Sequence, residues 1–325
     1  MYADYALEIR EFFLRFMALD DFAIKGFQLI LFQKASAFSM EQLHQVMSSA
    51  FSDYVIQMNM SLADFERMIT GRGFDPDLSW VAVEDKQLVG FWFIGKQEAF
   101  PNTLYAVATG TVPEARAKGI ARKLFAQLQD HAARKGYSQI RLEVITSNTA
   151  AVNAYEKLGF ATKRDFQCFN LHKTAIADRA IAQTPVPASW ADIEPKAAGL
   201  WESPPSWQNA AFAIRALGEE AATYKIEQDG KLAAYIVFTR KTGSVMQIAV
   251  APQHRRRGLA SALLATACAN VGKDSLTFIN VDEADKTIMQ TLSQLGATKT
   301  LQQYEMERAL QTSSSLAEQE MQPAT

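Results

Sequence analysis

The decapeptide VPEARAKGIA at residues 112–121 has a near copy, APQHRRRGLA, at residues 251–260. Each copy follows an apolar run, passes a proline and enters a helical pattern through a basic turn that contains glycine. A turn of this kind points several backbone N–H groups and the positive end of a helix dipole at one spot, which suits a phosphate or pyrophosphate. The chain is therefore expected to carry two phosphate-binding spots.

The repeat extends well beyond these two turns. A hairpin pattern with its turn at residues 85–87 precedes the first copy, and one with Asp229-Gly230 at its tip precedes the second. Asp-Gly is a strong signal for a two-residue hairpin loop. Both copies are followed by a helix with one apolar stripe, a strand, a helix closed by glycine (Gly159 or Gly296) and a last strand. Each half thus predicts a mixed α/β fold with a mixed sheet.

Length and composition indicate two domains. A chain of 325 residues exceeds one ordinary core and fits two domains of about 150 residues each. Pro185 and Pro187, in a stretch without clear periodicity, mark the linker. We expect a leader helix at 1–27, a first domain at 28–173, a linker at 174–188, a second domain at 189–310 and a disordered tail at 311–325. A start at Met17 is an alternative for the leader.

Bulk properties exclude several classes of protein. A net charge of −2 argues against an extended nucleic-acid surface. Charged residues interrupt the apolar start of the chain, which therefore fits neither a signal peptide nor a membrane span. Cys168 and Cys268, one per half, form no disulfide framework, and the four histidines lack zinc-type spacing. We expect a cytoplasmic protein with no membrane, nucleic-acid or metal partner.

Two motifs resemble those of the GNAT acetyltransferase superfamily. The pattern Arg-x-x-Gly-x-Ala at 116–121 and 255–260, each after a strand and a proline, is similar to motif A, and NTAAVNAYEKLGF at 148–160 looks like motif B. A lone six-residue pattern recurs by chance, but two copies in strand–helix context, one with motif B behind it, are specific. The resemblance covers nearly the whole chain and implies two tandem GNAT-like acyl-CoA N-acyltransferase domains.

The resemblance also implies acetyl-CoA as co-substrate, lying between two splayed central strands in each half. Its pyrophosphate would sit on main-chain N–H groups of the two turns, with the Arg and Lys side chains at the rim. The cofactor-binding residues expected on this basis are Thr111, Val112, Arg116, Ala117, Lys118, Gly119, Ile120, Ala121 and Asn148 in the first half, and Val250, Arg255, Arg256, Arg257, Gly258, Leu259 and Ala260 in the second.

Tyr155 is the expected catalytic residue, because this motif-B position in the family often carries a tyrosine whose hydroxyl faces the CoA sulfur. In the second half the matching position is Leu292, which cannot donate a proton, and Asp285 stands where Asn148 would be. The second copy therefore binds CoA without turnover, uses another group such as Tyr304, or serves as a scaffold.

The acceptor side carries weaker signals. Glu143 and Asp53 are candidates for a general base acting through water, although an exposed or salt-bridged carboxylate is the favoured interpretation of each. Asp53, Tyr54 and Trp207 fall where the family builds its acceptor pocket, and aromatic groups suit an amine-bearing ligand. Trp207 is equally well explained as an inter-domain packing residue.

The leading hypothesis is an N-acetyltransferase that acetylates a primary amine of a small molecule or peptide. The amine would attack acetyl-CoA directly in a ternary complex held by the N-terminal domain, and the protein would be a monomer or homodimer. Two alternatives stay open. Both halves could bind CoA in a non-catalytic sensor or interaction protein, or the C-terminal domain could be catalytic beside a degenerate N-terminal copy.

Overall fold

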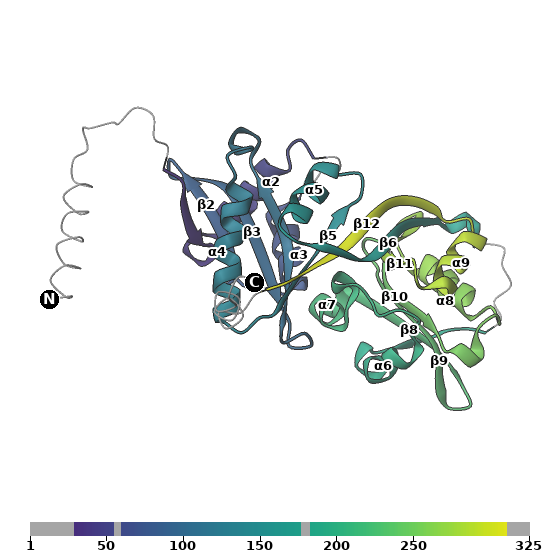
Figure 1. The fold of residues 1–325 in the computed structure, drawn as a ribbon. Coiled ribbons are helices and arrows are strands. Elements are labelled where there is room, and N and C mark those ends of the chain that lie inside the picture. The colour runs from purple at the N-terminus through teal and green to yellow at the C-terminus, as the bar shows by residue number, and fades with distance from the viewer. Residues whose placement is uncertain (1–28, 55–59, 177–182, 311–325) are drawn as a thin grey trace, which may run out of the picture.

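The computed structural model describes residues 29–54, 60–176 and 183–310 (Figure 1). The expected leader helix and tail lie outside these residues. The N-terminal half consists of β1 (Leu31–Lys34), α2 (Met40–Ala50), α3 (Leu62–Gly71), β2 (Trp80–Glu84), β3 (Gln87–Lys96), β4 (Thr103–Thr111), α4 (Ile120–Arg134), β5 (Gln139–Ile145), α5 (Thr149–Lys157) and β6 (Ala161–His172).

The C-terminal half repeats this order. It consists of β7 (Val186–Ala188), α6 (Trp190–Ala197), α7 (Ala211–Leu217), β8 (Ala221–Gln228), β9 (Lys231–Thr239), β10 (Ser244–Val250), α8 (Leu259–Asn270), β11 (Ser275–Asp282), α9 (Lys286–Gln294) and β12 (Thr298–Ala309). The mixed α/β plan predicted for both halves is confirmed. One detail differs: the end of the expected linker is strand β7, which pairs with β8.

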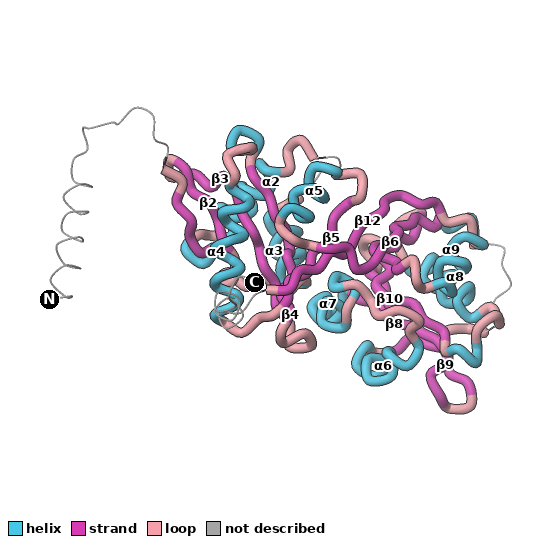
Figure 2. The backbone as a smooth tube through the Cα atoms, viewed as in Figure 1, coloured by secondary structure: helices cyan, strands magenta, loops and turns pink. Residues whose placement is uncertain are grey.

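All the described strands form a single sheet with the order β1-β2-β3-β4-β5-β12-β6-β11-β10-β9-β8-β7 (Figures 1 and 2). The last strand of each half is exchanged. β12 lies between β5 and β6, pairing Tyr304 with Val144 on one side and with Asp165 on the other. β6 in turn pairs with β11, where Phe169 lies opposite Phe278. Each half therefore contributes a strand to the other.

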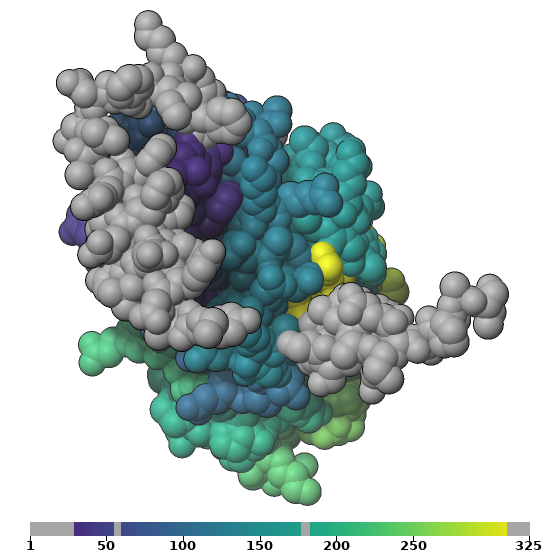
Figure 3. Space-filling model, turned by 60° about the vertical axis from the view of Figure 1, so that its left-hand side comes forward, coloured from purple at the N-terminus to yellow at the C-terminus, as the bar shows by residue number. Residues whose placement is uncertain are grey.

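The exchange places the end of β12 against the N-terminal half. The Leu310 N–H donates to the Ser138 carbonyl oxygen at 2.7 Å. In the space-filling view, the yellow end of the described chain accordingly lies beside teal residues of the first half (Figure 3). Within the described residues, no helix is both long enough and apolar enough to pass through a bilayer.

The two predicted hairpin turns form because their residues tolerate left-handed backbone. Asp85 and Lys86 have φ of 50° and 65°, and Asp229 and Gly230 have φ of 52° and 71°. Consecutive positive φ angles are those of a type I′ turn, whose twist matches that of the flanking strands. The turns join β2 to β3 and β8 to β9.

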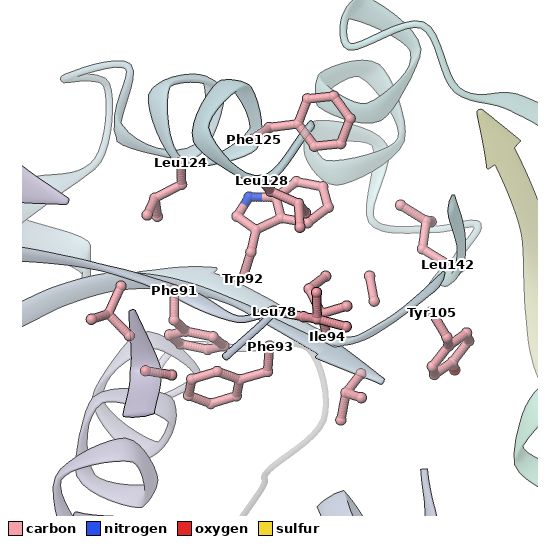
Figure 4. Packing of buried hydrophobic residues seen from close by; sticks show 14 of the residues in the cluster. Leu78, Phe91, Trp92, Phe93, Ile94, Tyr105, Leu124, Phe125, Leu128 and Leu142 are labelled. Carbon is pink, nitrogen blue, oxygen red and sulfur yellow. The ribbon is translucent and has the colours of Figure 1, made fainter. Parts of the chain in front are cut away.

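Side chains of β3 alternate between two helical layers. Trp92 points towards α4, where it packs against Phe125 with ring centroids 5.0 Å apart. Phe91 and Phe93 point to the opposite face, the side of α2, and stack at 4.3 Å (Figure 4). All four rings are buried. This two-sided core holds the central strands rigid, so that the polar groups carried by neighbouring β4 and β5 are held in defined positions.

Candidate active site

Both basic turns leave a helix N-terminus uncovered. Ala117 and Gly119 in the first turn have φ of 62° and 71°, and Arg256 and Gly258 in the second have φ of 61° and 76°. Gly119 and Gly258 are the N-cap residues of α4 and α8, and neither N-terminus has a side-chain cap. By contrast, Asn148 and Asp285 cap α5 and α9 with their side chains; Asn148 Oδ1 accepts from the Ala151 N–H at 3.1 Å.

The open N–H groups of each half have the arrangement that an anion site requires. The Lys123 N–H donates to the Gly119 carbonyl oxygen at 3.1 Å, and the Ala262 N–H donates to that of Gly258 at 3.0 Å. The N–H groups of the first helical turn, which precede these donors, have no intrahelical carbonyl to reach. Together with the helix dipole they attract a phosphate or carboxylate.

The first arginine of each turn binds a carbonyl oxygen at the end of the strand before it and so fixes the loop. Arg116 Nε donates to the Thr111 carbonyl oxygen and Arg255 Nε to that of Val250, both at 3.2 Å. The remaining Arg116 nitrogens bind the Asp53 carboxylate at 2.6 and 2.7 Å. Arg116 thereby holds the pKa of Asp53 below its usual range. Asp53 is thus an exposed, salt-bridged carboxylate, which is the interpretation that the sequence favours.

Lys118 likewise holds the first turn in place. Its Nζ donates to both carboxylate oxygens of Glu84 at 3.0 Å, which ties the turn to the end of β2. The side chains of the first turn therefore hold its shape, and the main-chain N–H groups are left to bind a ligand.

β4 and β5 diverge next to this turn. They pair in parallel only from Thr103 with Gln139 to Tyr105 with Arg141. Beyond that point a cavity of about 580 Å³ opens between them. Its polar lining includes Tyr54, Arg72, Tyr105, Thr109, Glu143, Asn148, Tyr155, Gln208 and Gln303. We call this space the N-terminal cavity; strands β11 and β12 of the other half form part of its wall.

Tyr155 lies in the N-terminal cavity, on α5. Its hydroxyl is 2.5 Å from the Thr109 hydroxyl on β4, and either oxygen can be the donor. Burial raises the pKa of Tyr155 to about 12. The phenol therefore stays protonated at neutral pH and can donate a hydrogen bond where the two strands separate.

Glu143 also faces this cavity, from β5. The Tyr105 hydroxyl donates to Glu143 Oε2 at 2.9 Å and the Asn280 amide at 2.7 Å, and Gln208 Nε2 donates to the same oxygen. The other oxygen, Oε1, is buried and finds no hydrogen-bond partner among the described residues. Burial raises the pKa of Glu143 above its ordinary value, against the opposing effects of Gln208, Arg72 and Tyr105.

The favoured sequence interpretation of Glu143, an exposed or salt-bridged carboxylate, is therefore wrong. Its charge faces a cavity, and neutral donors compensate it. The nearby Arg164 forms no salt bridge with it either, because its guanidinium binds the Glu305 carboxylate at 2.7 Å. A buried carboxylate with one free oxygen is poised to accept a proton or to bind an N–H donor.

Of the expected acceptor residues, only Tyr54 lines the N-terminal cavity. Trp207 is a packing residue between the halves: its ring stacks on Tyr105 at 4.9 Å, and its indole N–H donates to the Arg72 carbonyl oxygen at 3.1 Å. It is 3% exposed. The neighbouring Gln208 is the residue of this segment that reaches the cavity.

Several polar residues at this site carry little or no functional signal in the sequence. Thr109 had a weak signal, since it lies in the strand that leads to the first turn. Arg72 and Asn280 had none, because their partners are distant in sequence: Asn280 and Glu143 are 137 positions apart.

The matching cleft of the C-terminal half is smaller and lacks two hydroxyl groups of the N-terminal cavity. A cavity of about 100 Å³ lies between β10 and β11. Val250 and Thr111 correspond, because the carbonyl oxygen of each accepts from the first arginine of its turn. Two residues earlier, the C-terminal half has Ile248 where the N-terminal half has Thr109. Leu292, in the place of Tyr155, is fully buried. Tyr304, the alternative acid, lies on β12 and packs against the N-terminal core.

Glu202 bridges this second cleft. Its carboxylate accepts from Arg255 Nη1 at 2.9 Å and from the Lys286 N–H, at the start of α9, at 3.0 Å, and it also bonds Thr287 Oγ1. The second turn still lines a cavity of about 430 Å³. The C-terminal half thus keeps the uncapped helix N-terminus but has no counterpart of the Tyr155 and Thr109 hydroxyl groups. No three His, Cys, Asp or Glu side chains gather to hold a metal ion in the described part of the chain.

The sequence is similar to known acetyltransferases. The model of the Acetyltransferase (GNAT) family matches residues 41–160 and again 188–290. A mycothiol acetyltransferase of Renibacterium salmoninarum is 35% identical over 121 residues, which span 36% of this chain and 36% of that protein. N-alpha-acetyltransferase 30 of Schizosaccharomyces pombe is 32% identical over 102 residues, 30% of this chain and 67% of that protein. The chain thus matches little more than a third of the mycothiol acetyltransferase.

Two solved structures share the fold over most of the chain. A tandem GNAT protein from the clavulanic acid biosynthesis pathway has a TM-score of 0.65 at 16% identity, covering 88% of this chain and 100% of its own. A GCN5-related N-acetyltransferase from Sphaerobacter thermophilus has a TM-score of 0.65 at 14% identity, covering 87% of this chain and 96% of its own. Both likenesses extend across the two halves.

Proposed function

The chain belongs to the Acetyltransferase (GNAT) family, and we propose that it transfers an acetyl group from acetyl-CoA to a primary amine, with the N-terminal half catalytic. One juxtaposition carries this proposal. β4 and β5 separate around a cavity that is lined by Tyr155 and Glu143, and β4 leads through the first turn to the uncapped N-terminus of α4.

The residues of the first turn fit a diphosphate. Left-handed backbone at Ala117 and Gly119 turns the chain so that the first N–H groups of α4 stay uncapped. Such consecutive N–H groups bind phosphate oxygens. Thr111 and Val112 lead into the turn, and Asn148 lines the cavity beyond it. Acetyl-CoA bound here would supply the acyl carbon and a thiol leaving group.

Glu143 would prepare the acceptor. A free alkylamine titrates near pH 10.4, as lysine does, so it arrives as an ammonium ion and must lose a proton. The unpartnered Glu143 Oε1 suits an N–H donor of this charge. Its raised pKa makes the buried carboxylate a stronger base than an exposed one. One ammonium proton would pass to Oε1. The nitrogen lone pair would then form the C–N bond as the C–S bond breaks, and the second proton lost by the acylated nitrogen would pass to the departing thiolate.

Tyr155 would stabilise the departing sulfur. Because burial raises its pKa to about 12, the phenol enters the reaction protonated. A thiol titrates near 8.5, so the phenol donates a hydrogen bond to the thiolate more readily than it gives up its proton. The Thr109 hydroxyl, 2.5 Å away, fixes the direction of the phenol group.

Tyr155→Phe is expected to lower kcat by roughly 10- to 100-fold, because the substitution removes the hydrogen bond to the leaving group. The affinity for acetyl-CoA, measured by calorimetry, should stay within about twofold, since the turn that binds the diphosphate is unchanged. Thr109→Val tests the orientation of the phenol and should have a smaller effect. A Tyr155→Phe enzyme with the wild-type kcat would remove Tyr155 from the mechanism.

The C-terminal half we propose to be non-catalytic. Ile248 and Leu292 replace two hydroxyl-bearing residues, and Glu202 links Arg255 to the start of α9 across the cleft. Its expected cofactor residues around Gly258 keep the anion site. They would bind the diphosphate of a second CoA only weakly, because the space between β10 and β11 is small.

The direct test is acceptor-dependent release of free thiol. The protein is mixed with acetyl-CoA and a panel of primary amines and peptides, and the thiol is measured with a chromogenic disulfide. Release above the acceptor-free rate, together with a mass gain of one acetyl group on an amine, is expected. Tight CoA binding with no release for any amine would favour the sensor alternative.

A further inference from the structure

Residues of the C-terminal half hold the Glu143 carboxylate, and we propose that Gln208 and Asn280 are positioning residues for this base. The inference rests on the proposed function, in which Glu143 accepts the proton of the amine. It assigns the second half a specific part in the reaction: its amides fix which carboxylate oxygen faces the acceptor and help to hold the base ionised.

The donors to Glu143 converge on one oxygen. Asn280 Nδ2 donates to Oε2 at 2.7 Å, and Gln208 Nε2 and the Tyr105 hydroxyl donate to the same atom. Two of the three donors come from the other half of the chain. Because all three bind Oε2, Oε1 is left without a partner among the described residues. The carboxylate is thus held in one orientation.

Each of the two amides is itself held at its carbonyl end. Arg72 Nη2 donates to Gln208 Oε1 at 2.6 Å, and Gln303 Nε2 donates to Asn280 Oδ1 at 2.7 Å. An amide whose oxygen accepts a hydrogen bond must present its NH2 group on the other side. Arg72 and Gln303 therefore direct both NH2 groups at Glu143.

Gln208 also separates two opposite charges. Its amide lies between the Arg72 guanidinium and the Glu143 carboxylate, bonded to both. A direct ion pair would lower the pKa of the carboxylate and occupy its free oxygen, and both changes would weaken a base. A neutral amide in this place stabilises the ionised carboxylate while leaving it basic.

The backbone around Gln208 and Asn280 holds both side chains in place. Asn280 has φ of 56° at a bulge of β11, where the register with β6 shifts between Phe278 and Val281. Left-handed backbone is uncommon outside glycine, although asparagine tolerates it. Next to Gln208, Asn209 Nδ2 donates to the Ile279 carbonyl oxygen at 2.7 Å. This contact joins the segment that carries Gln208 to the bulge that carries Asn280.

The test replaces each amide by an isosteric carboxylate. Asn280→Asp and Gln208→Glu keep the shape and the accepting oxygen but exchange a donor for a like charge beside Glu143, which raises its pKa. The acid limb of the kcat/KM profile should move to higher pH. The rate at neutral pH should fall roughly tenfold or more and recover as pH rises. Asn270→Asp, the same change at an exposed residue of α8, should leave the profile in place.

A second readout does not depend on turnover. In protein labelled with carboxyl-¹³C glutamate, the Glu143 resonance is identified by its loss in Glu143→Gln, and its titration midpoint is compared between variants. A higher midpoint in Asn280→Asp or Gln208→Glu supports positioning, even if the wild-type protein acetylates no amine and the proposed function fails. Midpoints equal to the wild-type value in both variants overturn the inference. Asn280→Gly, which suits the left-handed backbone, replaces Asn280→Asp if that variant does not fold.

Discussion

Glu143→Gln is expected to lower kcat for acetyl transfer by about 100-fold or more, the usual effect of removing a positioned base. The expected loss corresponds to about 2.7 kcal/mol of transition-state stabilisation. An amide cannot take the proton that the ammonium group must release. Its NH2 group would take the place of Oε1, which has no hydrogen-bond partner among the described residues.

The fold should tolerate this change. The carbonyl oxygen of the new glutamine can accept from Tyr105, Gln208 and Asn280 as Oε2 does, so the melting temperature should not fall. Glu66→Gln, the same substitution at an exposed residue of α3, serves as the matched control and should keep the wild-type rate. A Glu143→Gln enzyme with an unchanged rate would assign the proton to water instead.

The dependence of kcat/KM on pH tests the same role of Glu143. Burial raises the pKa of Glu143 above its ordinary value of 4.5. Activity requires the ionised form, so kcat/KM should fall as pH decreases through a midpoint above 4.5. Glu143→Gln should lose this limb.

Gly119→Glu is expected to weaken acetyl-CoA binding by about 100-fold or more, which is at least about 2.7 kcal/mol. A Cβ built at Gly119 meets no atom within 4 Å, so the side chain has room in the open mouth of the turn. Its carboxylate would sit at the positive end of α4 and compete there with the diphosphate. Calorimetry and thiol release should both register the loss.

Two control variants separate the effect of the added charge from that of backbone strain, and the first turn from the second. Gly119→Ala tests the backbone alone: φ is 71° there, and a non-glycine residue is strained by about 1–2 kcal/mol. Its loss of affinity should be much smaller than that of Gly119→Glu. Gly258→Glu places the same charge in the second turn and should leave turnover intact. Loss of activity only with Gly258→Glu would move catalysis to the C-terminal half.

Local patterns were sufficient to predict most of the elements. A strand is predicted after the helix that follows each basic turn, and β5 and β11 occupy these two places; Gly159 and Gly296 follow the ends of α5 and α9, as predicted. Hairpin turns, apolar stripes and glycine caps depend on neighbours a few residues apart, and such short-range signals survive in a single sequence.

The environment of Glu143 was predicted wrongly because it depends on residues far away in the sequence. A glutamate on a strand is most often exposed or ion-paired, and nothing near Glu143 in the sequence indicates otherwise. Its environment depends on partners 65 and 137 positions away. The exchange of β6 and β12 brings these groups together, and strand order across two halves leaves no periodic trace in either half.

The sequence by itself determined the repeated α/β plan, the two basic turns before α4 and α8 and the place of Tyr155 on a helix, because these follow from residue spacing along one helix or strand. Only the tertiary structure decided that Glu143 is buried with a free oxygen, that Trp207 is a packing residue, and that the second cleft is bridged by Glu202. Each of these outcomes depends on desolvation and on hydrogen bonds between distant segments, which exist only once the shared sheet has formed.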